Sequence, residues 1–119
     1  MSRGDWHTLR DGAVVTVARR LPARFDVMAE AAFPLLRRGR LAHLIRQDVW
    51  RALQNQRGFS PVVRVERMSA GLAVRAGGRL DAPATRSLRD RIAAVLDDPA
   101  NRSRWARDAR LKGGDDDQA

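Results

Sequence analysis

The chain has 119 residues, 44% of them hydrophobic and 31% charged, which is typical of one globular domain and leaves too little chain for two independent cores. It contains no cysteine, so disulfides, thiolate catalysis and iron–sulfur ligation are excluded. Its formal net charge of +9, carried by arginines with Lys112 as the single lysine, favours an anionic partner: nucleic acid, an anionic membrane surface or an acidic protein.

The N-terminal third predicts one strand and one helix. Residues 12–18 form a short, β-branched run at a turn-like pair, Asp11 and Gly12, which predicts a strand. Asp26 is a suitable N-cap for a helix that runs towards Arg38. Pro34 falls inside that helix, and we expect it to kink or split the helix because proline lacks the backbone donor.

Residues 40–57 give the clearest helical pattern in the chain. Leu41, Ile45 and Val49 recur at the spacing of one helix face. Gly58 follows as a natural stop, because glycine readily adopts the left-handed backbone that ends many helices.

The C-terminal half predicts a β-hairpin and a further helix. Residues 62–68 and 72–76 alternate apolar and charged side chains on either side of a short turn, as the strands of a hairpin do. Asp81 or Thr85 is suited to cap the helix that follows. A short helical turn is expected over residues 103–111.

Together these elements predict an α+β fold in a single compact domain over residues 1–111. Its sheet is expected to be small, antiparallel or mixed, and three-stranded, with one N-terminal strand and the hairpin packed by two to three helices. If residues 13–18 instead continue into helix, the fold becomes mainly helical with one appended hairpin. Residues 112–119 predict a flexible acidic tail, and the lack of an apolar run that could cross a bilayer favours a cytoplasmic location.

Residues suited to catalysis or cofactor binding are scarce. The only histidines, His7 and His43, lie far apart in the sequence, and no phosphate-binding glycine loop or nucleophile motif accompanies them. The paired aspartates before Pro99 are typical of a solvated helix end. The sequence therefore predicts a non-enzymatic protein with no catalytic residue, no metal site and no cofactor.

Candidate binding residues are concentrated around the helix predicted over residues 40–57. Its polar face carries arginines, glutamines and one tryptophan, and a basic cluster precedes it in an expected loop between two helices. Arginine grips phosphate oxygens, glutamine reaches base edges, and tryptophan stacks on an unpaired base or anchors a protein contact. The predicted binding residues are Arg37, Arg38, Arg40, Arg46, Gln47, Trp50, Arg51 and Arg57.

These residues support two functions. The favoured one is a small arginine-rich binding protein that contacts the phosphates of RNA or DNA with little sequence selectivity. The alternative is an adaptor or assembly factor that docks on an acidic protein or self-associates as a homo-oligomer, with Trp50 as an anchor. A third interpretation assigns these residues no binding role: Trp50 packs in the core and the arginines only keep the exposed side of the helix soluble. Trp6 and Trp105 are expected to pin the two terminal segments to the core.

Overall fold

A computed structural model describes residues 6–111 and contains one antiparallel sheet and three helices in that range. The strands lie in the order β1-β2-β4-β5-β3, and every neighbouring pair is antiparallel. The α+β class is confirmed, whereas the expected three-stranded sheet is wrong, because the sheet has five strands. In chain order the elements are β1 (His7–Asp11), β2 (Val14–Ala18), β3 (Val27–Phe33), α1 (Arg38–Leu53), β4 (Ser60–Met68), β5 (Gly71–Arg79), α2 (Arg86–Asp97) and α3 (Pro99–Asp108).

The strand β3 replaces the helix predicted over residues 26–38. It pairs with β5 along its whole length. Val27, Ala29 and Phe33 are buried while Glu30 is exposed, which is the two-residue alternation of a half-buried strand. Alanine, methionine and glutamate favour helix in isolation, but pairing with the buried strand β5 outweighs that small propensity.

Two residues that suggested the wrong helix have other roles. Asp26 caps no helix: its carboxylate accepts a hydrogen bond from the backbone N–H of Leu80 (2.8 Å) and pairs with Arg24 (2.8 Å). The hydrogen bond from Arg24, followed by that from Leu80, lowers the pKa of Asp26. Pro34 follows the last residue of β3 directly, where the missing backbone donor interrupts no ladder.

The edge strand β1 has no counterpart in the sequence prediction. Its five residues are all exposed and show no apolar alternation, so no local pattern marks them as a strand. The strand exists because it pairs with β2 at one edge of the sheet. β2 itself confirms the strand predicted over residues 12–18, and the helical alternative for that segment is wrong.

The strands β4 and β5 confirm the predicted hairpin and extend it. Val63, Val65 and Val74 are buried in the core, as the alternation predicts. β5 also continues through Gly77, where an added Cβ would collide with the carbonyl oxygen of Val27 in β3. Glycine at this position therefore allows the two strands to approach each other.

The three helices follow the predicted order with shifted bounds. α1 starts at residue 38 rather than 40 and ends at residue 53 rather than 57. Thr85, one of the two suggested caps, accepts a hydrogen bond from the backbone N–H of Leu88 (3.1 Å) at the start of α2. The turn predicted over residues 103–111 is a ten-residue helix, α3, which Asp98 caps by accepting from the backbone N–H of Ala100 (2.9 Å).

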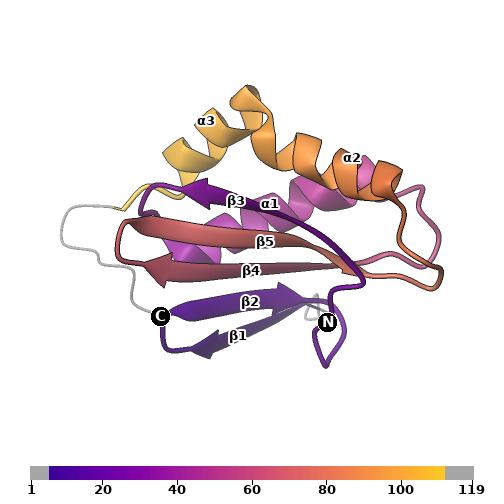
Figure 1. The fold of residues 1–119 in the computed structure, drawn as a ribbon. Helices are drawn as coiled ribbons and strands as arrows, with labels where there is room; N and C mark the ends of the chain where they lie inside the picture. Colours follow the sequence, from indigo (N-terminus) through magenta and orange to yellow (C-terminus); the bar gives the residue numbers. More distant parts are fainter. Residues whose placement is uncertain (1–5, 112–119) are drawn as a thin grey trace.

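The helices leave one face of the sheet uncovered (Figure 1). α1 lies behind the sheet in this view and contacts β2, β4 and β5, while α2 packs along β3 and α3 contacts both other helices. The core between the sheet and the helices is apolar. The uncovered face instead carries ion pairs, between Arg64 and Glu66 (3.1 Å) and between Arg75 and Glu30 (3.1 Å).

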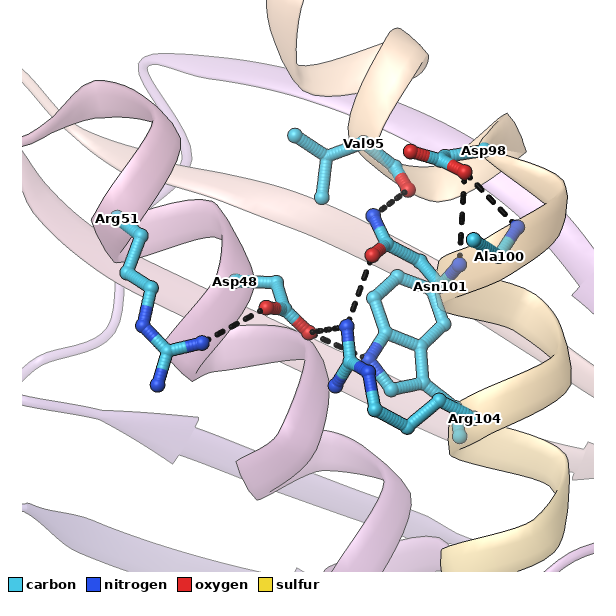
Figure 2. Close-up of polar contacts among 8 residues, drawn as sticks. Asp48, Arg51, Val95, Asp98, Ala100, Asn101 and Arg104 are labelled. Carbon is cyan, nitrogen blue, oxygen red and sulfur yellow. Dashed lines mark hydrogen bonds and ion pairs between the residues drawn. The ribbon is translucent and has the colours of Figure 1, made fainter.

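The helix α3 is held to α1 through Trp105, whose indole is fully buried. Its Nε1–H donates to the Asp48 carboxylate of α1 at 2.7 Å. Arg104 and Arg51 donate to the same carboxylate at 3.0 Å and 3.3 Å (Figure 2). The expectation that Trp105 pins the C-terminal segment to the core is confirmed.

The two ends of the chain are described to different extents. Trp6, the first described residue, is partly buried against the core, as expected for an anchor of the N-terminal segment. The acidic tail predicted over residues 112–119 lies outside the described residues. Within residues 6–111, none of the helices combines the length and the apolar character needed to cross a membrane.

Candidate anion-binding surface

Four arginines from two distant segments line one hollow of about 550 Å³, which we call the arginine hollow. Arg37 and Arg40 come from the start of α1, and Arg107 and Arg110 come from the end of α3 and the residues after it. Asp108 also lines the hollow, so its side chains carry a net charge of +3, four arginines minus one aspartate. Guanidinium groups gathered in this way are suited to phosphate and carboxylate anions.

Contacts between α1 and α3 create the arginine hollow. The backbone N–H of Arg37 donates to the carbonyl oxygen of Ala109 (2.8 Å), and its Nη2 donates to the carbonyl oxygen of Asp108 (2.9 Å). Arg107 pairs with the Asp108 carboxylate (3.3 Å). The Nε of Arg37 is buried without a hydrogen-bond partner among the residues described. Arg37 is therefore held in place by backbone carbonyls, which leave its full positive charge in the hollow.

Arg38, the central arginine of the predicted basic cluster, lies beneath this surface. It is fully buried and donates a hydrogen bond to the carbonyl oxygen of Gly12 (2.9 Å), in the turn between β1 and β2. The cluster was expected in a loop between two helices, but it lies between β3 and α1, and Arg38 begins the helix. Because a buried charge needs hydrogen bonds, Arg38 is suited to securing the β1–β2 hairpin to α1 and not to contacting a ligand.

The other predicted binding residues lie on the outward side of α1 or just after it. Trp50, which the sequence left open as core or surface, has 37% of its surface exposed. Arg40 and Trp50 are ten residues apart, which corresponds to about 15 Å along the helix axis. The exposed members of the predicted set are Arg40, Gln47, Trp50, Arg51 and Arg57, and Arg46 is partly buried.

The electrostatics at His43 show how positive this side of α1 is. His43 Nε2 lies 3.0 Å from the hydroxyl of Thr8 in β1, and its Nδ1 lies 3.4 Å from Arg46. Burial lowers the pKa of His43 below its ordinary value, and the charges of Arg46, Arg40 and Arg10 lower it further. Three guanidinium groups from α1 and β1 therefore act on one imidazole.

Trp6 links α1 to the end of β2. The guanidinium of Arg46 lies 4.3 Å from the centre of the Trp6 ring, and that of Arg19 lies 5.7 Å from it. Burial and the neighbouring charge of Arg19 lower the pKa of Arg46. The indole thus holds two like charges near each other through cation–π contacts, which extends the basic surface towards the C-terminal end of α1.

A second hollow, of about 580 Å³, lies at that end of α1 and is called the tryptophan hollow below. A glycine shapes one of its walls: Gly58 has a φ of 74°, and an added Cβ there would collide with the carboxylate of Asp81. The lining side chains that bear on binding are Arg19, Arg20, Trp50, Ser60 and Asp81.

Sequence reasoning missed several of these cationic residues because they come from other segments. Arg19 and Arg20 follow β2, whereas Arg107 and Arg110 belong to the C-terminal helical segment. The one local signal was the spacing of three between Arg107 and Arg110, which would place both on one side of the helical turn expected over residues 103–111. Arg10 lies in the unpredicted strand β1, and its guanidinium packs against Gly39 of α1.

Within residues 6–111, no three histidine, aspartate or glutamate side chains come together as a group that could hold a metal ion. Comparison of the chain with known proteins found no matching family model, no matching curated protein and no matching solved structure.

Proposed function

We propose that this is a small, non-enzymatic protein that binds RNA or DNA by contacting phosphates with the arginine hollow and the outward side of α1. The observation that carries the proposal is that four arginines line one hollow. Two come from the start of α1 and two from the end of α3 and the residues after it, far apart in the chain. The positive charges of neighbouring guanidinium groups repel one another, and a bound polyanion offsets that repulsion. The outward side of α1 extends about 15 Å from Arg40 to Trp50, which is long enough to contact several consecutive phosphates of one strand.

The distribution of paired charges supports the same surface. On the uncovered face of the sheet, Arg64 and Arg75 each pair with a glutamate. The arginine hollow has one carboxylate for four guanidinium groups. The excess of positive charge is therefore greater at the arginine hollow than among these sheet residues, and such an excess attracts a polyanion.

Contacts of this kind give affinity with little sequence selectivity, because a guanidinium bound to a phosphate carries no information about the base. They also make binding depend on salt, since each neutralised phosphate releases counterions. Four phosphate contacts on duplex DNA correspond to a slope of about −3.6 for the logarithm of the binding constant against the logarithm of salt concentration, or about a 150-fold loss between 50 and 200 mM salt.

The test compares two double variants with the same change in charge. Arg40→Glu/Arg110→Glu alters two exposed residues of the arginine hollow, and Arg86→Glu/Arg89→Glu alters two exposed residues at the start of α2. Binding to generic single-stranded and duplex oligonucleotides is measured across a salt series. We expect the first variant to weaken binding and to lower the magnitude of the slope by about 1.8 for the duplex and about 1.4 for the single strand, and the second to keep a slope near that of the wild type.

Equal behaviour of the two variants would show that only net charge matters and would contradict a defined phosphate-binding surface. Failure of the wild-type protein to bind either probe at low salt would refute the proposal. That second result would leave docking on an acidic protein as the function to pursue.

A further inference from the structure

The tryptophan hollow differs in its chemistry from the arginine hollow at the other end of α1. Arg19, Arg20 and Asp81 give it a net charge of +1, two arginines minus one aspartate, against +3 for the arginine hollow. It is also lined by the ring of Trp50. Such a hollow suits a flat group with polar edges better than it suits an isolated phosphate.

Trp50 supplies the flat surface. More than a third of it is exposed, although the adjacent Val49 is fully buried and Trp105 is fully buried on α3. Tryptophan is highly buried on average, so an exposed ring that lines a hollow is suited to covering a ligand. The hollow, at about 580 Å³, is within the range of about 300–1,000 Å³ that small organic ligands occupy.

The polar groups around the ring fit the edges of a nucleobase. The Asp81 carboxylate, which packs against Gly58, accepts hydrogen bonds and suits an exocyclic amino group. The Ser60 hydroxyl both donates and accepts. Arg20 is exposed at the same hollow, where it can meet the phosphate next to that base.

The position on α1 connects this hollow to the phosphate-binding surface. Arg40 lines the arginine hollow and Trp50 lines the tryptophan hollow, about 15 Å apart along the helix axis. His43 and Gln47 lie between them on the outward side of the helix, at the spacing of successive turns. A strand whose phosphates lie over the arginine hollow therefore extends along α1 towards Trp50.

We propose that the tryptophan hollow binds one unpaired nucleobase, stacked on Trp50, and that the protein consequently prefers single strands to duplexes. This inference rests on the proposed function and adds the form of nucleic acid that is bound. In a duplex each base is stacked and paired, so its face is closed to an aromatic side chain. A single strand exposes that face at no cost in pairing.

The experiment measures binding of a single-stranded oligodeoxycytidine, whose bases carry an exocyclic amino group, and of a blunt duplex of the same length. Each probe is tested with the wild-type protein, Trp50→Leu and Trp50→Phe. We expect the wild type to bind the single strand more tightly than the duplex. Trp50→Leu should weaken single-strand binding by about 5- to 150-fold and change duplex binding less than twofold. Trp50→Phe keeps an aromatic ring, so it should lose less affinity for the single strand than Trp50→Leu does. Circular dichroism and thermal unfolding establish that the variants are folded.

A second measurement uses the wild-type protein alone, so it does not depend on a variant that folds. Stacking of a base on Trp50 quenches its fluorescence, and we expect quenching by the single strand but not by the duplex. Three outcomes would overturn the inference while the phosphate-binding proposal stands. Either Trp50→Leu keeps the wild-type affinity for the single strand, or it loses affinity equally for both probes, or both probes quench the fluorescence equally. If the wild-type protein binds neither probe, both proposals fail.

Discussion

The substitution Asp48→Ala tests how α3, and with it half of the arginine hollow, is held in place. The Asp48 carboxylate accepts the Nε1–H of the fully buried Trp105 at 2.7 Å and also pairs with Arg104 and Arg51. Alanine would leave the indole N–H buried without an acceptor. Because α3 carries Arg107 and leads to Arg110, its attachment determines where these cations lie.

The size of the effect follows from the burial of each partner. A buried donor left without an acceptor costs about 1–3 kcal/mol. The ion pair with Arg104 is partly exposed and adds about 0–1 kcal/mol, and the pair with Arg51, whose side chain is 68% exposed, adds less. We therefore expect Asp48→Ala to lower the free energy of unfolding by about 2.5 kcal/mol, within a range of about 1–4 kcal/mol, and the melting temperature by about 10 °C for a domain of this size.

Two control variants separate the contributions in urea and thermal unfolding experiments. Asp48→Asn keeps an acceptor oxygen for Trp105 and loses only the charge, so we expect a loss of about 1 kcal/mol. Arg51→Ala removes only the exposed ion pair, and we expect a change below about 0.5 kcal/mol. Two results would contradict this role of Asp48: a free energy of unfolding for Asp48→Ala within about 0.5 kcal/mol of the wild type, or equal losses in Asp48→Asn and Asp48→Ala.

Two further predictions concern pH and backbone geometry. The pKa of His43 in the folded protein is below its ordinary value of 6.5, so the unfolded chain binds more protons just below that pH, and the free energy of unfolding should fall as the pH is lowered through it. His43→Gln should reduce this dependence in urea unfolding at pH 7.5 and 5.5, and an unchanged dependence would show that another group causes it. Gly58→Ala should cost about 1–2 kcal/mol because of the positive φ, and more because its Cβ meets Asp81. A double-mutant cycle with Asp81→Gly, which removes the whole side chain that the new Cβ would meet, should recover this second part only, and full additivity would contradict that contact.

The sequence by itself determined the elements whose signals are local. The alternation in residues 62–68 and 72–76 marked the hairpin, and the apolar spacing from Leu41 marked α1. The capping pattern offered Asp81 or Thr85 as the start of α2, and Thr85 is the residue that caps it. Composition likewise established the excess of positive charge, and the helical period placed Arg40 and Gln47 on the outward side of α1, while the exposure of Trp50 was left open.

Only the tertiary structure decided the elements and contacts that depend on residues far apart in the chain. β1 has no apolar alternation and exists through its pairing with β2, and residues 27–33 favour helix until β5 pairs with them. No local pattern indicates that Arg38 is buried under the β1–β2 turn. The arginine hollow requires the end of α3 to meet the start of α1, about 70 residues earlier, and the buried Trp105 and its bond to Asp48 provide that contact.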